Sequence, residues 1–376
     1  GKNRLLSVII ITTQCFFPKI GGIESLMTGM AEAMSSAGKD VLVLSDGKKT
    51  LDDENKKYKI KRFSGWKPYR RRRKAIYLKK IIANNNIEAI YADSWKSVEY
   101  LKQVNVKIVV LAHGTEIPKK YFDNFYAFLN IKKRRIIKSY ANCQKIAANS
   151  AYTKDLMIAS LKINQDKIKI IHPGIDIYED FISNVDRQNV KQIIKDSSPI
   201  ITTLARVEKR KGHKFVINAI MELKSKFPNM LYLVAGKGPY LDEIKKYVSM
   251  LHLEKYVVFL GWITEPEKSL VLQSSDVFIM TPTTIGESVE GFGMVFIDAA
   301  FHGIASIGTL SGGISDAVIN NQTGLLCEDG NQKNITKNID RLLSNKKLRD
   351  ELGRNGKIRA RNQYAWDYKV LEYLDL

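Results

Sequence analysis

The sequence offers little that would place the chain in a membrane. Among its 376 residues no apolar run approaches the about eighteen that a membrane-spanning helix requires. No positively charged start leads into an apolar signal segment, and no lipidation signal is present. We therefore expect a cytoplasmic protein.

Cysteine and histidine are also scarce. The three cysteines, Cys15, Cys143 and Cys327, lie far apart and show neither disulfide nor zinc spacing, which fits a reducing compartment. The five histidines form no cluster and no Asp-x-Asp motif occurs, so we expect no bound metal. The G-x-G-x-x-G fingerprint is missing too, which disfavours a nicotinamide enzyme.

The first half of the chain has few acidic residues. The net charge is +21; residues 1–180 hold 34 basic and 17 acidic side chains, and residues 181–376 hold 26 and 22. Residues 70–74 and 132–135 are dense basic clusters. Two such clusters favour an anionic partner, either nucleic acid or anionic lipid headgroups.

The chain alternates short apolar runs with helical patterns, and this alternation predicts an α/β fold with parallel sheets. The chain is longer than a domain with a single hydrophobic core usually is, so we expect two domains. A polar stretch before residue 198 separates two series and places the boundary near residues 180 and 181. The strands are predicted at residues 5–12, 41–45, 89–92, 107–112 and 145–148, and then at 200–205, 231–235, 257–260, 277–280 and 305–308. The clearest helical patterns are residues 24–37, 121–140 and 366–374.

Ligands of open parallel sheets bind outside the carboxyl ends of the strands, so the loops after the strands are the candidate sites. Gly21 and Gly22 follow the first strand and precede a helix, where a backbone amide could reach a phosphate or a sugar; a simple tight turn is the alternative. His113 directly follows the strand at residues 107–112. A lone histidine is often structural, but its position makes it a candidate.

The second series has its own candidates. Arg206 and Lys211 follow its first strand, and two cations at a strand end could clamp a diphosphate. Surface charge is the alternative for either cation. The loops after the next two strands add weaker candidates, which are Gly236, Gly238, Gly261 and Trp262.

The stretch at residues 290–298 is the most informative in the chain. It places two carboxylates, Glu290 and Asp298, eight residues apart around a glycine-rich helix start at Gly293. If Gly293 begins a helix, Asp298 lies inside it and Glu290 lies on the loop before it. The amides and partial positive charge of a helix start suit a phosphate or sugar oxygens.

Taken together these motifs resemble the retaining glycosyltransferases of family 4. The resemblance spans nearly the whole chain and rests on Gly21-Gly22, His113-Gly114-Thr115, Asn149-Ser150, Pro173-Gly174-Ile175-Asp176, Arg206 with Lys211-Gly212, Gly236 with Gly238, and residues 290–298. It implies a GT-B fold, in which two doubly wound Rossmann-like domains face each other across a cleft. Residues 1–180 would bind the acceptor and be completed by residues 362–376, and residues 181–361 would bind the nucleotide-sugar donor.

The resemblance also implies roles for the candidates. Arg206 and Lys211 would neutralise the donor diphosphate, Glu290 would hydrogen-bond the donor sugar, and His113 would contact that sugar. Donor contacts would further come from Gly21, Gly22, Gly236, Gly238, Gly261, Trp262, Phe292, Gly293, Met294, Val295 and Asp298. The family usually has Glu where Asp298 stands, so the ribose contact could be looser, and Ser315 occupies a position where Pro is common.

The mechanism implied is a front-face displacement, in which the leaving phosphate accepts the proton of the acceptor. Cations and amides at the phosphate stabilise the charge that develops there more in the transition state than in the ground state. We expect a metal-independent hexosyltransferase without a cofactor, using a GDP- or UDP-linked donor, with mannose from GDP-mannose favoured.

The acceptor is expected to be a lipid-linked glycan or a glycolipid, as in lipopolysaccharide, capsule or glycolipid synthesis. The basic first half would sit on the anionic inner face of the membrane. A sugar-nucleotide epimerase of GT-B fold and a basic nucleic-acid-binding protein remain the alternatives. No recognisable nucleic-acid-binding module supports the second of these.

Overall fold

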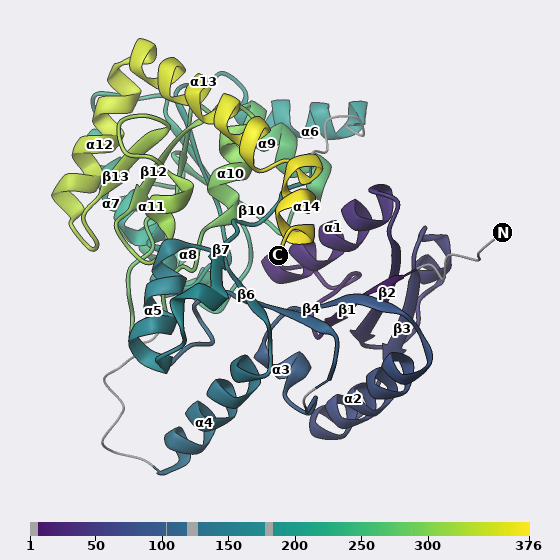
Figure 1. Cartoon of the computed structure of the whole chain (residues 1–376). Coiled ribbons are helices and arrows are strands. Elements are labelled where there is room, and N and C mark those ends of the chain that lie inside the picture. Colours follow the sequence, from purple (N-terminus) through teal and green to yellow (C-terminus); the bar gives the residue numbers. More distant parts are fainter. Residues whose placement is uncertain (1–6, 103, 119–126, 177–182, 287) are drawn as a thin grey trace. The chain divides into compact units, whose positions relative to one another are not determined.

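The protein forms two compact units. In a computed structural model, residues 1–176 and 364–376 make the first unit, and residues 177–363 make the second. The structure describes residues 7–102, 104–118, 127–176, 183–286 and 288–376 (Figure 1). Within these residues, no helix combines the length and apolar character needed to traverse a bilayer.

A seven-stranded parallel sheet forms the centre of the first unit. Its strands lie in the order β3-β2-β1-β4-β5-β6-β7. Their bounds are β1 Val8–Thr13, β2 Asp40–Asp46, β3 Lys59–Phe63, β4 Ile87–Ala92, β5 Lys107–Ala112, β6 Lys145–Ala148 and β7 Ile168–Ile170. The order reverses between β1 and β4, so the switch point of this doubly wound sheet lies between their carboxyl ends.

Helices cover both faces of this sheet. They are α1 Gly22–Ser36, α2 Lys67–Asn84, α3 Trp95–Val98, α4 Ala127–Ala141, α5 Ala151–Leu161 and α14 Trp366–Leu374. Alternate residues of β1 point to opposite faces, as the pleat of a strand requires. Ile9 and Ile11 pack with Met27 of α1 in one core, whereas Ile10 packs with Leu78 of α2 in the other.

The second unit repeats the plan with six parallel strands in the order β10-β9-β8-β11-β12-β13. Their bounds are β8 Ile200–Leu204, β9 Leu231–Ala235, β10 Val257–Gly261, β11 Val277–Ile279, β12 Ala305–Thr309 and β13 Gly324–Cys327. The helices are α6 Asn184–Ile194, α7 His213–Leu223, α8 Leu241–Met250, α9 Glu265–Gln273, α10 Met294–Phe301, α11 Ile314–Ala317, α12 Gln332–Ser344 and α13 Lys346–Gln363. The switch point of this sheet lies between β8 and β11.

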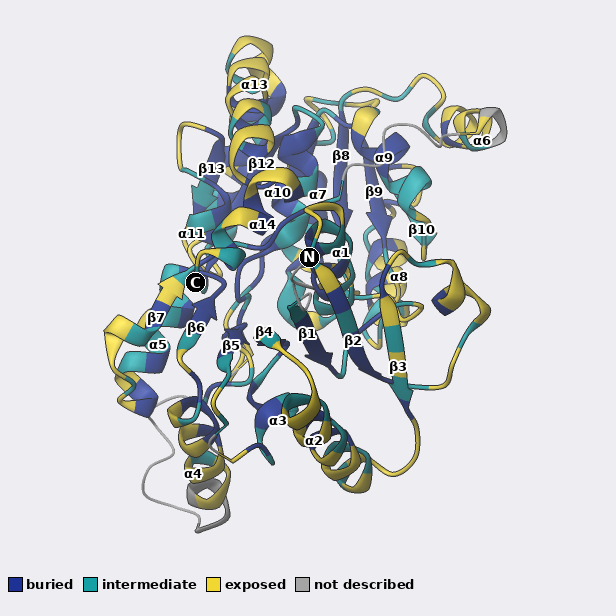
Figure 2. Ribbon diagram, turned by 45° about the vertical axis from the view of Figure 1, so that its right-hand side comes forward, coloured by how far each residue is buried: buried dark blue, intermediate teal, exposed yellow. Residues whose placement is uncertain are grey.

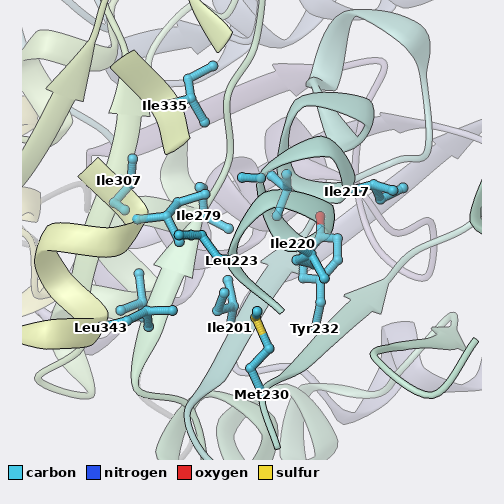
Figure 3. Packing of buried hydrophobic residues seen from close by; sticks show 14 of the residues in the cluster. Ile201, Ile217, Ile220, Leu223, Met230, Tyr232, Ile279, Ile307, Ile335 and Leu343 are labelled. Atoms are coloured by element: carbon cyan, nitrogen blue, oxygen red, sulfur yellow. The ribbon is translucent and has the colours of Figure 1, made fainter. Parts of the chain in front are cut away.

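The main core of the second unit lies between the sheet and the helices α7 and α12. Figure 3 shows Ile201 of β8 and Ile279 of β11 lying near Ile220 and Leu223 of α7, with Ile335 of α12 in the same cluster. Figure 2 shows β8 and β9 in the dark blue of buried residues. On the other face of these strands, Leu231 and Leu233 pack with Leu270 of α9, so β8 and β9 are covered on both sides.

Most of the predicted elements are confirmed. The strands at residues 107–112, 145–148 and 231–235 and the helix at residues 366–374 have the predicted bounds. The first predicted strand begins at Val8, and residues 5 and 6 lie outside the described residues, as do residues 121–126 of one predicted helix. Three strands, β3, β7 and β13, were not predicted from the sequence.

The segment 364–376 completes the first unit. In α14 the indole of Trp366 packs so closely over two glycines that a Cβ at Gly29 or Gly174 would lie 2.3 or 2.6 Å from it. The hydroxyl of Tyr91, on β4, donates to the carbonyl of Tyr373 at 2.8 Å. The last helix is therefore an integral part of the first core.

Candidate active site

Two loops meet at the switch point of the second sheet. The loop after β8 carries residues 205–212, and the loop after β11 carries residues 280–293. The Thr283 amide donates to the Arg210 carbonyl at 2.8 Å, and the Thr281 hydroxyl donates to the Gly212 carbonyl at 3.0 Å. A Cβ at Gly212, where φ is +79°, would lie 1.9 Å from the Thr281 carbonyl oxygen, so only glycine permits this approach.

Glu290 lies at the centre of this meeting point. Its Oε2 accepts a hydrogen bond from Lys211 Nζ at 2.5 Å and another from Arg210 Nη1 at 3.1 Å. Burial alone would raise the pKa of Glu290, but the charges and hydrogen bonds of Lys211 and Arg210 outweigh it and hold that pKa below its usual value. Glu290 is therefore a fixed anion that can accept hydrogen bonds from the hydroxyls of a ligand.

The three basic residues of the β8 loop differ in position. The side chain of Arg206 is 74% exposed, and its guanidinium pairs with Glu208 at 3.1 Å. Arg210 also pairs with Glu208, at 3.2 Å, and connects it to Glu290. Of the two cations predicted from the sequence, Lys211 contacts Glu290, while Arg206 lies further out on the loop. Arg210 was not predicted as a site residue.

The helix start at Gly293 is confirmed. Gly293 has φ +89° and precedes α10, and Met294 and Val295 form its first turn. Phe292 is buried, which anchors the loop, and the Gly313 amide donates to the Glu290 carbonyl at 2.9 Å. The first amides of a helix lack intrahelical acceptors, so this turn presents donors suited to an anion.

Asp298 lies in α10 and is held by a lysine of α9. Its Oδ2 is 3.4 Å from Lys268 Nζ, and Lys268 also pairs with Glu265 at 2.5 Å. Burial would lower the pKa of Lys268, but the two carboxylates raise it well above its usual value. Lys268, which was not predicted as a site residue, therefore positions the Asp298 carboxylate.

The glycines after β9 have a packing role in addition to any contact with a ligand. A Cβ at Gly236, where φ is +139°, would lie 1.9 Å from the Ala205 carbonyl oxygen, and one at Gly238 would lie 2.3 Å from that of Val207. The Gly236 amide donates to the Gly261 carbonyl at 2.7 Å. These contacts join the loops after β8, β9 and β10, and Trp262 beside them is 51% exposed.

His213 begins α7 directly after this cluster. Its ring is buried, and among the described residues neither ring nitrogen has a hydrogen-bond partner. Burial, with a smaller effect from the charge of Lys211, lowers its pKa to about 4. His213 is therefore neutral at physiological pH and does not compete with Lys211 for an anion.

The remaining predicted residues belong to the first unit. Gly21 is extended and caps α1, and Gly22 is the first residue of that helix. His113 follows β5 and is buried; its Nε2 lies 2.8 Å from the Asp93 carbonyl oxygen, and its backbone amide donates to Glu116 at 2.7 Å. His113 thus lies at the carboxyl end of the first sheet, as predicted.

The basic run at residues 70–74 is only partly a surface cluster. Lys74 is buried, and its Nζ lies 2.6 Å from Asp46 and 2.7 Å from the Thr13 carbonyl oxygen. Arg70 pairs with the same Asp46 at 2.8 Å. Two members of the predicted polyanion-attracting cluster therefore stabilise the interior, because Asp46, at the end of β2, is buried and needs partners.

In the described part of the chain, no group of three or more His, Cys, Asp or Glu side chains is placed to hold a metal ion. The lysines, arginines and carboxylates of the site offer charges to a ligand. Their combination, cations beside a fixed anion at a helix start, suits a ligand with both a phosphate and hydroxyl groups.

Comparisons with known proteins agree with this chemistry. A family model described as Glycosyltransferase Family 4 matches residues 20–179, and one described as Glycosyl transferases group 1 matches residues 184–359. The chain is 23% identical over 373 residues to the GDP-mannose-dependent alpha-(1-6)-phosphatidylinositol monomannoside mannosyltransferase of Mycolicibacterium smegmatis, and the match covers 95% of each protein.

Solved structures show the same fold. Anabaena Alr3699/HepE in complex with UDP-glucose matches with a TM-score of 0.77 and 18% identity, covering 98% of this chain and 99% of that one. Sucrose-phosphate synthase from Thermosynechococcus elongatus matches with a TM-score of 0.78 and 18% identity, covering 98% and 97%. The fold is therefore GT-B, as the resemblance implied, and the chain is a transferase enzyme that belongs to the family 4 glycosyltransferases.

Proposed function

We propose that this enzyme transfers a hexose, with retention of configuration and without a metal ion, from a nucleotide-sugar to an acceptor at the membrane surface. The observation that carries the donor part is the contact of Lys211 and Arg210 with Glu290 at the switch point of the second sheet. This cluster combines the two chemistries that a nucleotide-sugar needs, which are cations for its diphosphate and an anion for its sugar hydroxyls.

The charges of this cluster suit the bond that would break. When the bond between the anomeric carbon and the diphosphate breaks, negative charge develops on the leaving phosphate. Lys211 has three donors and uses one on Glu290, so others remain for a phosphate oxygen. Arg206, exposed on the same loop, would add a second cation, and the first turn of α10 would add amides.

GDP-mannose is the favoured donor. A relative that matches 95% of the chain is named as a GDP-mannose-dependent mannosyltransferase, and this supports the choice. A structural neighbour binds UDP-glucose, so a UDP-linked hexose is the competing donor. Asp298, held by Lys268, would accept hydrogen bonds from the ribose hydroxyls, which both donors share.

The exposed face of α2 supports a membrane-bound acceptor. Tyr69 and Ile76 of α2 are 59% and 67% exposed, and their spacing of seven residues places them on one side of the helix. Trp66, which directly precedes α2, is 76% exposed. Arg73, on the same side, lies over the Tyr69 ring at 5.7 Å. Aromatic and aliphatic groups beside cations favour the boundary of an anionic membrane, which would place the enzyme peripherally on its inner face.

A thermal-shift panel of nucleoside diphosphates and nucleotide-sugars tests the donor part. We expect GDP and GDP-mannose to raise the melting temperature of the wild-type protein, and the Lys211→Ala variant to lose most of that shift. Lys209→Ala is the matched control, because Lys209 is an exposed lysine of the same turn. A panel in which no nucleotide-sugar stabilises the protein would contradict the proposal.

An assay of the nucleotide-sugar product separates transfer from epimerisation. A transferase releases the nucleoside diphosphate and depends on an acceptor. An epimerase would convert the nucleotide-sugar with no acceptor present, and a nucleic-acid-binding protein would retard random DNA at physiological salt without responding to nucleotide-sugars.

A further inference from the structure

The loop after β8 carries one carboxylate among its cations. Residues 206–211 read Arg-Val-Glu-Lys-Arg-Lys, so Glu208 has four basic residues around it in the sequence. The proposed function places the diphosphate of the donor at this loop, and a carboxylate repels a diphosphate. Glu208 is therefore unfavourable for phosphate binding unless it has another task.

Both oxygens of Glu208 are used by arginines. Oε1 lies 3.1 Å from Nη1 of Arg206, and Oε2 accepts from Nε of Arg210 at 3.2 Å. The pair with Arg206 contributes little, because that side chain is exposed and water and salt screen the interaction. The pair with Arg210 is more enclosed, since the side chains of Glu208 and Arg210 are only 22% and 20% exposed.

Arg210 is held at three points. Its carbonyl oxygen accepts from the amide of Thr283 at 2.8 Å, which ties its backbone to the loop after β11. Its Nε donates to Glu208, and its Nη1 donates to Oε2 of Glu290 at 3.1 Å. A guanidinium is planar and rigid, so a partner that fixes Nε also restricts where Nη1 lies. Glu208 therefore acts on Glu290 through Arg210.

Glu290 receives these contacts on one of its two oxygens. Among the described residues, the hydrogen bonds that its carboxylate accepts from Arg210 and Lys211 both go to Oε2. Lys211 is also the lysine proposed to bind the diphosphate, and its ammonium is carried on a flexible stem. Arg210 is the more rigid partner, so it keeps the carboxylate in place when the lysine binds a phosphate.

We propose that Glu208 is a positioning residue of the donor site, which orients Arg210 so that Arg210 holds Oε2 of Glu290 and leaves Oε1 to accept from the donor sugar. This inference rests on the proposed function and adds to it the residue that orients the sugar-binding carboxylate. Glu208 itself contacts neither the phosphate nor the sugar. Its loss should therefore weaken the binding of the sugar without weakening the binding of the diphosphate.

Calorimetry on the full chain separates these two effects. GDP and GDP-mannose form one pair of probes, UDP and UDP-glucose form the other, and the pair that binds the wild-type protein is used. Glu208→Met removes the charge and both acceptor oxygens, so we expect the affinity for the diphosphate to stay the same or rise. Relative to that affinity, the affinity for the nucleotide-sugar should fall about tenfold, the cost of one hydrogen bond to a charged group.

Two further variants test the route through Arg210. Arg210→Lys keeps the positive charge but lacks the rigid fork of donors, so it should lose nucleotide-sugar affinity as Glu208→Met does. The double variant should lose no more than either single variant, because the two residues act in sequence. Glu351→Met is the matched control, since Glu351 is exposed on α13 and its loss changes the net charge equally.

Three results would overturn the inference while the proposed function stands. Equal weakening of diphosphate and nucleotide-sugar binding by Glu208→Met would show that Glu208 only stabilises the loop. No weakening of either would show that it only balances charge. Additive losses in the double variant would show that it does not act through Arg210. A wild-type protein that binds neither pair of probes would contradict the proposed function and this role together.

Discussion

The carboxyl ends of the two sheets have the same topology but use charge differently. At the second sheet, Lys211 and Arg210 converge on Glu290, so cations and carboxylate are matched within the site. At the first sheet, Arg70 and Lys74 both pair with the buried Asp46. Lys96, close in sequence to the end of β4, has no ion-pair partner among the described residues.

This difference indicates separate ligand chemistries on one fold plan. A matched cluster suits a ligand that carries both a phosphate and sugar hydroxyls, because cations and anion are both used. The cations that Asp46 holds inside the first unit stabilise the fold and are not available to a ligand. The fold supplies the loops in both units, and the residues on those loops decide what they bind.

Removing Lys74, the buried cation of the first unit, should have the largest effect on stability. We expect Lys74→Met to lower the free energy of unfolding by about 3–5 kcal/mol, because it takes one partner from the buried Asp46. Urea denaturation followed by circular dichroism measures this. Adding Asp46→Asn should recover part of the loss, whereas Lys79→Met on the exposed face of α2 should change stability by less than about 0.5 kcal/mol. A small cost for Lys74→Met would mean that the two sheet ends do not differ in this way.

Removing the cation of the second sheet should reduce activity more than stability. Lys211→Ala should lower the transfer rate by about 10²- to 10³-fold, the cost of losing one preorganised donor to a developing negative charge. The initial rate of nucleoside diphosphate release measures it, with Lys209→Ala as the control. A Lys211→Ala enzyme that keeps the full rate would show that the contact with Glu290 is structural.

Acid should also destabilise the second unit, because the buried His213 is neutral in the folded protein. Its folded pKa of about 4 lies below the unfolded value, so the unfolded chain binds the proton first as pH falls. Stability should therefore decrease from about pH 6.5 to about pH 4, by roughly 2–3 kcal/mol, and His213→Leu should remove that slope. Urea midpoints measured across this range test the sign. An equal slope in both proteins would contradict the buried neutral ring.

The smallest effect concerns two basic helices of 18 residues, α2 in the first unit and α13 in the second. Ile76 of α2 and Ile358 of α13 are 67% and 57% exposed. We expect Ile76→Ala to weaken binding to anionic vesicles by about 1 kcal/mol, because the side chain would leave the membrane boundary, and Ile358→Ala to change nothing. Vesicle sedimentation measures both variants. Equal losses would show that α2 is not the membrane-facing helix.

The sequence was sufficient for the central strands but for only one of the four edge strands, β10. The strands covered by helices on both faces are apolar runs, and all of these were predicted. The missed strands β3, β7 and β13 each lie at an edge of a sheet. An edge strand has one hydrogen-bonded neighbour and more contact with water, so β3 has the sequence Lys-Ile-Lys-Arg-Phe, which has no apolar run to recognise.

The loops that carry the candidate site were predicted from the sequence, but the ion pairs between their side chains were not. The sequence placed Lys211, Glu290 and the helix start at Gly293 correctly on their loops. It did not reveal that Arg210 contacts Glu290, because three consecutive basic residues occupy the turn and only its geometry decides which ones turn inward. Lys268 was missed for a related reason, since its partner Asp298 lies thirty residues further along the chain.

The docking of α14 has a consequence for biosynthesis. A ribosome reaches Trp366 only after it has made every residue of the second unit, yet Trp366 fills the space over Gly29 and Gly174 in the first. The core of the first unit can therefore be completed only after the carboxyl-terminal segment has been synthesised. An expression vector that stops at residue 176 would yield an incomplete core, and a usable fragment requires residues 364–376 to be fused or supplied as a peptide.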